Sequence, residues 1–188
     1  MLPDPRGASA PPLRLVVMGV AGCGKSTLAR ALGVALRLPV IEGDDFHPPH
    51  NRELMRQGIA LTDADRAGWL AALGNELARH AGGALLSCSA LKRAYRDRLR
   101  HAAPGLRFAY LALDESSALA RVQARAGSHF FNPGLVRSQF ETLEVPDGEP
   151  GVLSLDALQP IEALRDATLD WLARDAAFPS DSNHGDKP

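Results

Sequence analysis

The residues best suited to chemistry lie between positions 19 and 27, where the sequence reads GVAGCGKST. This run matches the phosphate-binding pattern of a glycine, four residues, a second glycine, a lysine and a serine or threonine. Glycines let successive backbone N–H groups turn toward phosphate oxygens, Lys25 can reach the β- and γ-phosphates, and the Ser26 hydroxyl can hold Mg²⁺. The predicted phosphate loop consists of Gly19, Val20, Ala21, Gly22, Cys23, Gly24, Lys25, Ser26 and Thr27.

The sequence on either side of this loop supports the interpretation. The run from Leu15 to Met18 is apolar, as in a buried parallel strand, and apolar residues recur at helical spacing from Ser26 to Leu36. A helix that begins there directs the positive end of its dipole at a bound anion. The alternative, a glycine-rich turn that arises by chance, does not explain this order of strand, loop and helix. Cys23 is interpreted as a small filler rather than a nucleophile.

Two carboxylates follow the next strand-like run. Glu42 and Asp44 are two residues apart, so in an extended backbone their side chains project from the same side. Ligands of open α/β sheets bind at the carboxyl ends of the strands. We expect Glu42 to help hold Mg²⁺ and Asp44 to accept the proton of an attacking hydroxyl. The alternative is a solvated acidic turn.

Histidines and cations lie near two strand ends. His47 and His50 could indicate a metal site, but no cysteine or third ligand is near in the sequence, and hydrogen bonding to a substrate is the preferred interpretation. After the third predicted strand, Ser89 and its small neighbours leave room for a polyol, while Lys92 can meet a carboxylate or phosphate. The alternative for this cationic stretch, which also contains Arg96, is a solvated first helical turn.

Arg121 and Arg125 lie four residues apart on one face of a predicted helix and precede a segment that contains Gly127. Arginines at the edge of such a loop suit a lid, at about residues 121–135, that closes over a nucleotide and stabilises charge on the transferred phosphoryl group. The alternative is a pair of surface arginines. The sequence has no Asn-Lys-x-Asp, and no Asp-x-x-Gly after the third strand, which disfavours a signalling GTPase.

Short apolar runs alternate with helical patterns along the chain, which predicts an α/β domain with a parallel sheet. The predicted strands are Leu13–Met18, Pro39–Glu42, Ala84–Ser89, Arg107–Leu113 and Gly151–Leu155. The predicted helices are Lys25–Leu36, Asn51–Arg56, Asp63–His80, Leu91–His101, Ser116–Ala126, Pro133–Leu143 and Pro160–Arg174. Thr62 and Asp65 form a variant of the capping box at the start of the third helix, and Gly82 and Gly83 are expected to stop it.

The chain has 188 residues, enough for one domain with a substantial core. Its formal net charge of −1 offers no basic surface for nucleic acid and no polybasic patch for a membrane, and no apolar run is long enough to cross a bilayer. We expect residues 13–176 to form a single domain between disordered tails at 1–12 and 177–188. Two cysteines in segments predicted to be buried, and a start without the features of a secretory signal, favour a cytoplasmic protein.

Five blocks of the sequence together resemble the gluconokinases of the small, P-loop type. They read MGVAGCGKST, EGDDFHPPHN, ALTDADRAGWL, CSALKRAYRDRLR and HFFNPGLVRSQFETLEVP, and the similarity runs through most of residues 13–174. Shikimate kinases share the phosphate loop and the acidic strand end, but not the DADRAGWL, SALKRAYRD or SQFETLE blocks. The resemblance implies an adenylate-kinase-like P-loop fold, a three-layer α/β sandwich whose five-stranded parallel sheet has the order 2-3-1-4-5.

The same resemblance implies ATP- and Mg²⁺-dependent phosphorylation of D-gluconate to 6-phosphogluconate, often by a homodimer. The positions that it places at the sugar-acid site are Asp44, His47, Arg66, Ser89 and Lys92, with Gln139 near the acceptor. It assigns Arg125 and His129 to the lid. The expected catalytic residues are then Lys25, Asp44 and Arg125, with Arg121 at the nucleotide, and Ser26 and Glu42 at the metal.

These observations together predict a kinase that transfers phosphate from ATP to the C6 hydroxyl of gluconate. Two alternatives stay open. One is another small-molecule kinase, which acts on shikimate or a different sugar acid. The other is a regulatory module that binds ATP without phosphorylating a metabolite. The acidic strand end and the arginines of the predicted lid argue against the second alternative.

Overall fold

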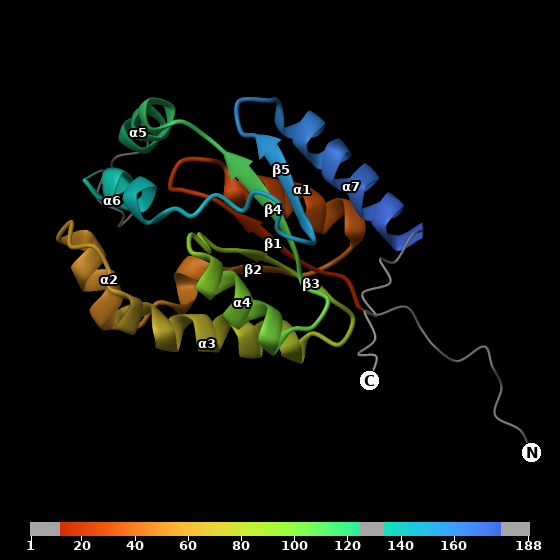
Figure 1. The fold of residues 1–188 in the computed structure, drawn as a ribbon, viewed down its shortest axis with the longest axis horizontal. Coiled ribbons are helices and arrows are strands. Elements are labelled where there is room, and N and C mark those ends of the chain that lie inside the picture. Colours follow the sequence, from red (N-terminus) through yellow and green to blue (C-terminus); the bar gives the residue numbers. More distant parts are fainter. Residues whose placement is uncertain (1–11, 125–133, 178–188) are drawn as a thin grey trace, which may run out of the picture.

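The computed structural model describes residues 12–124 and 134–177, which form a five-stranded parallel sheet flanked by helices (Figure 1). The strands are β1 (Arg14–Met18), β2 (Val40–Glu42), β3 (Ala84–Ser87), β4 (Arg107–Ala112) and β5 (Val152–Asp156). Their order across the sheet is β2-β3-β1-β4-β5, so the predicted fold class and strand order are confirmed. The helices are α1 (Lys25–Leu36), the 3₁₀ helix η1 (Gly43–Phe46), α2 (Pro49–Arg56), α3 (Asp63–Arg79), α4 (Arg93–Ala102), α5 (Glu115–Ala124), α6 (Leu135–Thr142) and α7 (Ile161–Ala177).

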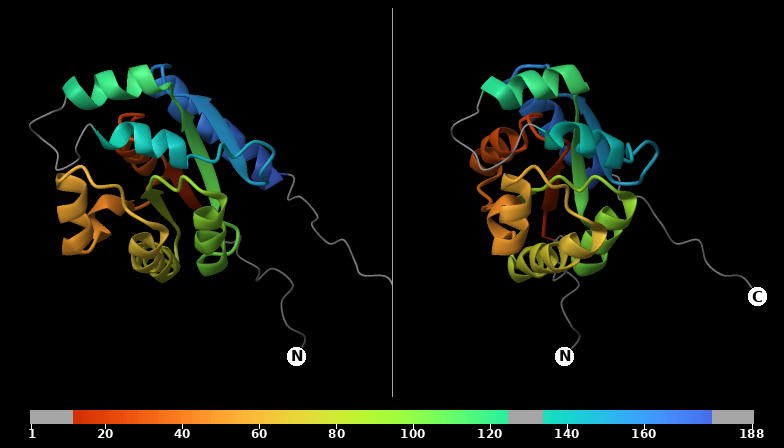
Figure 2. Two further views of the ribbon diagram at one scale, coloured as in Figure 1. Left: turned by 60° about the vertical axis from the view of Figure 1, so that its left-hand side comes forward. Right: turned by 90° about the vertical axis from the view of Figure 1, so that its left-hand side faces the viewer.

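The central strand is β1, which pairs with β3 on one side and with β4 on the other. Its run from Leu15 to Met18 is fully buried, as expected for a strand that is covered on both faces. Because side chains alternate along a strand, Val16 and Met18 pack with α3 and α4, whereas Leu15 and Val17 pack with α1 and α7. The sheet therefore lies between two helical layers, as Figures 1 and 2 show.

The parallel arrangement brings the carboxyl ends of all strands to one edge of the sheet. The phosphate loop follows β1 there, η1 follows β2, and the turn that contains Ser89 follows β3. Figures 1 and 2 show α2 on one side of this edge and α5 and α6 on the other, with the start of α1 between them. Ligands of open α/β sheets bind at this edge, so the fold gathers the predicted site residues where a ligand is expected.

The structure refines several predicted boundaries. The capping box at Thr62 and Asp65 is confirmed, and α3 ends at Arg79, ahead of the two glycines expected to stop it. The helix α4 begins at Arg93 rather than Leu91, because Ala90 takes a left-handed conformation (φ +43°) and turns the chain before the helix starts. Both cysteines are buried and free, as predicted.

Parts of the sequence-based interpretation lie outside the described residues. These are most of both predicted tails, residues 125–133 of the predicted lid, and the predicted cap at position 132. The last helix, α7, continues to Ala177, one residue past the predicted end of the domain. Among the described residues, no helix is long and apolar enough to cross a membrane.

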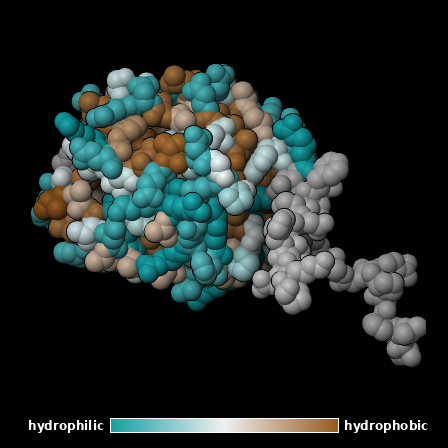
Figure 3. Space-filling view, in the orientation of Figure 1, coloured by the Kyte–Doolittle hydropathy of each residue, from teal (hydrophilic) through white to brown (hydrophobic). Residues whose placement is uncertain are grey.

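The surface differs between the two ends of the face shown in Figure 3. Hydrophilic residues predominate over α3 and α4, while apolar residues gather in the upper part of the view, around α5, α6 and β5. The large apolar side chains exposed near these elements are Leu119, Val145 and Leu158. The polar exterior of α4 follows from its sequence, RAYRDRLRHA, in which Tyr95, Arg96 and Leu99 are the buried members.

Candidate active site

The phosphate loop has the backbone geometry that its glycines predict. Gly22 has φ +80°, and a Cβ there would lie 2.9 Å from the carbonyl oxygen of Ala118. Gly24 has φ +101° and directly precedes α1, the helix whose first residue is Lys25. Both conformations are strained for any residue with a side chain, so the glycines are what allow the loop to reach the start of the helix. The free N–H groups of this first turn form the anion-binding end of α1.

The polar side chains of the loop are already ordered by contacts within the protein. The ammonium of Lys25 donates to the carbonyl oxygen of Val20 at 2.9 Å. Ser26 Oγ donates to Glu42 Oε2 at 2.8 Å and lies 3.3 Å from Ser87 Oγ. Glu42 also pairs with Arg30 at 3.1 Å. Cys23 is buried, and burial raises the pKa of its thiol, which agrees with a filler rather than a nucleophile.

Hydroxyl and carboxylate oxygens are the ligands that Mg²⁺ prefers, and Ser26 and Glu42 supply one of each at hydrogen-bond distance. These residues therefore fit the metal site that the sequence predicts. In the described part of the chain, no three histidine, cysteine or acidic residues form a group that could hold a metal. His47 and His50 are thus not part of such a cluster there.

The extended geometry predicted from Glu42 to Asp44 was wrong. The strand ends at Glu42, and residues 43–46 form the 3₁₀ helix η1. The two carboxylates have different surroundings: Glu42 contacts Ser26 and Arg30, whereas Asp44 lines a cavity. The turn is fixed from α3, because the indole of Trp69 donates to the carbonyl oxygen of Gly43 at 2.7 Å.

His47 is buried beside Asp44 and is stacked on Trp69, with 4.2 Å between the ring centroids. Its Nδ1 is buried and has no hydrogen-bond partner. Burial, together with the smaller effects of the nearby cations Arg66 and Arg52, lowers the pKa of His47 to about 4. The imidazole is therefore neutral at physiological pH and offers a hydrogen bond to a ligand without a positive charge.

The depressed pKa of His47 predicts a pH-dependent stability. Between about pH 4 and 6.5 the unfolded chain binds a proton at His47 that the folded chain does not, so the free energy of unfolding falls as the pH is lowered. From pH 7 to pH 5 this amounts to about 2 kcal/mol. Denaturant unfolding at both pH values should show that loss in the unaltered protein and a smaller loss in His47→Asn. Equal losses in the two proteins would contradict the assignment.

The phosphate loop, η1 and the helices α1, α2, α3, α5 and α6 all contribute residues to a cavity of about 370 Å³ at the carboxyl edge of the sheet. Predicted site residues that line it are Ala21, Gly22, Gly24, Lys25, Ser26, Thr27, Asp44, His47, Arg66, Ser89 and Gln139. Further residues in its wall, which the sequence did not single out, are Arg30, Met55, Leu61, Trp69 and Val122. The structure thus brings the phosphate loop and the predicted sugar-acid residues to one cavity.

Gln139 lines the cavity and connects the helix α6 to the phosphate loop. Its Oε1 accepts from the backbone N–H of Ala21 at 2.6 Å, a contact between residues 118 positions apart in the sequence. Since the carbonyl end of the amide faces that donor, its NH₂ end is the part left for a ligand. The helix α6 is thereby attached to the phosphate loop.

Other predicted site residues do not line the cavity. Lys92 pairs with Asp63 at 2.8 Å, and the hydroxyl of Tyr95 donates to the same carboxylate. The hydrogen bonds from Lys92 and Tyr95 lower the pKa of Asp63. Arg121 donates to the carbonyl oxygen of Ala157 at 3.1 Å. Predicted residues of the loop and metal site that also lie outside the cavity wall are Gly19, Val20, Cys23 and Glu42.

Two predicted lid residues, Arg125 and His129, lie outside the described residues. Of the residues that the sequence reasoning missed, Trp69 gave a misleading signal. A tryptophan at an apolar position of a helical pattern is ordinarily a core residue, and Trp69 is indeed buried. Its indole N–H, which must find a partner when buried, was the available hint of a polar role.

Comparison with known proteins shows which proteins this chain is similar to. A family model described as an AAA domain matches residues 15–144. The gluconokinase of Gluconobacter oxydans (strain 621H) is 46% identical over 143 residues, 74% of this chain and 80% of the relative. The thermoresistant gluconokinase of Escherichia coli (strain K12) is 41% identical over 163 residues, 85% of this chain and 93% of the relative. A crystal structure of a gluconokinase from Sinorhizobium meliloti 1021 aligns with a TM-score of 0.82 at 45% identity, covering 92% of this chain and 98% of that chain.

Proposed function

Since this chain belongs to the gluconokinase family, we propose that its cavity catalyses the ATP-dependent phosphorylation of D-gluconate at the 6-hydroxyl, giving 6-phospho-D-gluconate and ADP. The observation that carries the proposal is the shared cavity. Lys25 of the phosphate loop and Asp44 of η1 line the same cavity, and Arg66 and His47 line it with them. A phosphate donor and a hydroxyl acceptor can therefore meet there.

The phosphate loop and α1 bind the triphosphate. Backbone N–H groups at the start of α1 and the ammonium of Lys25 face phosphate oxygens and offset their charge. Ser26 and Glu42 would hold Mg²⁺, which when bound neutralises charge that develops on the phosphates. Arg121, Arg125 and His129 belong to the lid segment, and the arginines supply further positive charge.

The acceptor half of the cavity orients the sugar acid. Arg66 is the cation suited to the carboxylate of gluconate, since a guanidinium can donate two parallel hydrogen bonds to it. His47, Ser89 and the NH₂ of Gln139 offer hydrogen bonds to hydroxyl groups. Lys92 contributes indirectly, through its pairing with Asp63 at the start of α3. Asp44 accepts the proton of the C6 hydroxyl as its oxygen attacks the terminal phosphorus.

An acceptor panel tests the proposal directly. The purified protein is incubated with ATP, Mg²⁺ and either gluconate, shikimate, a second sugar acid or no acceptor, and ADP release is followed. We expect gluconate to raise ADP release well above the no-acceptor rate, and we expect the other acceptors not to do so. Faster release with shikimate would identify the other small-molecule kinase, and release at the no-acceptor rate throughout would favour a regulatory ATP-binding module.

We also propose that the protein acts as a cytoplasmic homodimer without nucleic-acid or membrane partners. The support is the resemblance to the family together with a formal net charge of −1. Light scattering of the purified chain on a sizing column should give twice the mass of 20.1 kDa.

A further inference from the structure

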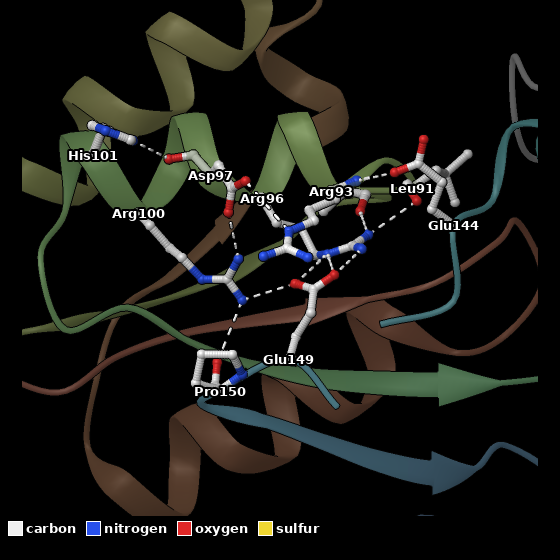
Figure 4. A network of polar contacts seen from close by, with 10 residues as sticks. Leu91, Arg93, Arg96, Asp97, Arg100, His101, Glu144, Glu149 and Pro150 are labelled. Atoms are coloured by element: carbon white, nitrogen blue, oxygen red, sulfur yellow. Dashed lines mark hydrogen bonds and ion pairs between the residues drawn. The ribbon is translucent and has the colours of Figure 1, made fainter. Parts of the chain in front are cut away.

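A fully buried arginine lies next to the acceptor site. The sequence placed Arg96 in a cationic stretch with a solvated alternative, yet it has no exposed surface. Its guanidinium donates through Nε to both oxygens of Glu149, at 3.0 and 3.2 Å, and Nη2 donates to Glu149 as well. Figure 4 shows Arg96 on one side of Glu149 and Arg100 on the other.

The remaining nitrogen of Arg96 holds the turn after β3. Nη1 donates to the carbonyl oxygens of Ala90 and Leu91, both at 3.0 Å. This turn needs such support, because Ala90 is a non-glycine residue at φ +43° and is itself fully buried. Without Arg96, two buried carbonyl groups would lose a partner at a strained position.

The turn that Arg96 holds is part of the active-site wall. Ser89 lines the cavity, and its carbonyl oxygen accepts from the N–H of Gly19, the first residue of the phosphate loop, at 3.3 Å. A shift of the turn would therefore move Ser89 relative to the loop. Since Arg96 does not line the cavity, its effect on a substrate must pass through this turn.

The segment between α6 and β5 provides the other end of the connection. It carries Glu149, and its Glu144 donates from the backbone to Leu91 O at 2.9 Å and accepts at its carboxylate from the N–H of Arg93 at 2.7 Å. The preceding helix α6 holds the phosphate loop through Gln139. The segment therefore contacts the acceptor turn directly and is connected to the phosphate loop through α6.

Stability alone is a weak reason for such a pair. Burying an arginine and a glutamate carries a desolvation penalty that apolar side chains avoid, and hydrophobic replacements of buried pairs are often no less stable. What apolar side chains cannot do is donate to the two carbonyl groups of the turn. The geometry therefore indicates that Arg96 orients the turn after β3.

We propose that Arg96, fixed by Glu149, is a positioning residue that holds the Ser89–Leu91 turn in place for the sugar acid. The assignment of the acceptor site rests on the proposed function. Arg96 acts through the turn and touches neither substrate. Loss of its bonds to Ala90 and Leu91 should impair use of the sugar acid while leaving the nucleotide half of the site intact.

The test compares two matched variants, Arg96→Lys and Arg100→Lys. Both keep a cation beside Glu149, but only the first removes the bonds to the turn, since Arg100 contacts Glu149, Asp97 and Pro150 instead. For Arg96→Lys we expect kcat/KM for gluconate to fall about tenfold or more, with KM for ATP within about twofold. Backbone hydrogen exchange in a peptide covering residues 87–92 should also become faster. For Arg100→Lys, neither the gluconate constants nor this exchange should change.

Several outcomes would overturn the proposal. Unchanged gluconate constants in folded Arg96→Lys would do so, as would equal losses in the two variants, because a general loss of stability would then explain both. If Arg96→Lys does not fold, Glu149→Gln keeps the shape of the pair and should still raise KM for gluconate severalfold without changing KM for ATP; no rise would contradict the positioning role. If the unaltered protein does not phosphorylate gluconate, the proposed function fails, while the exchange comparison still tests Arg96.

Discussion

Lys25→Met should lower kcat about 10³-fold while the protein stays folded. The substitution keeps most of the apolar part of the side chain and removes the ammonium. Lys25 lines the cavity, and its ammonium donates to the carbonyl oxygen of Val20. Charge on the transferred phosphoryl group would then lose the cation that the phosphate loop supplies. Steady-state assays with ATP and gluconate measure the loss, and a thermal unfolding curve measures the fold.

The control for Lys25→Met is Arg79→Met. Arg79 is a cation at the end of α3 whose side chain is 79% exposed and contacts Glu76, so its loss changes net charge equally without touching the cavity. We expect Arg79→Met to retain normal turnover. A Lys25→Met protein with normal turnover would remove the phosphate-loop assignment.

Asp44→Asn should lower kcat by about 10²–10⁴-fold and leave KM for ATP nearly unchanged. The amide has the shape of the carboxylate but cannot take the proton of the C6 hydroxyl. Asp44 lines the cavity and lies in the turn after β2, where the indole N–H of Trp69 donates to the carbonyl oxygen of Gly43. Because this hydrogen bond does not involve the Asp44 side chain, the substitution should leave the backbone of the turn in place. The measurement is a pair of saturation curves, one for each substrate.

Asp45→Asn is a matched control for this prediction. Asp45 is the next residue of the same 3₁₀ helix, is exposed, and does not line the cavity. Its substitution should change turnover less than about twofold. If Asp44→Asn weakened ATP use as much as turnover, a metal-binding role would replace the role of proton acceptor. Equal effects of the two substitutions would argue against both roles.

The sequence by itself determined the local parts of this protein. The phosphate loop is a run of consecutive residues whose glycines, Lys25 and Ser26 match the pattern by their types and spacing alone. The capping box of Thr62 and Asp65 is equally local, since its partners are three residues apart. The buried run of β1 and the alternation of strands with helices were enough for the parallel sheet, because burial on both faces needs a continuous apolar strand.

The tertiary structure decided which partners the charged side chains take. Lys92 pairs with Asp63, 29 residues away, and Arg96 pairs with Glu149, 53 residues away. Neither cation is therefore left to a substrate or to solvent, as the sequence around them had suggested. Glu42 and Asp44 have different surroundings because a 3₁₀ turn interrupts the extended chain after Glu42. Ion pairs and hydrogen bonds act over a few ångströms, and the crossovers of the sheet determine which distant segments come that close. The spacing of residues along the chain therefore does not predict which distant side chains come into contact.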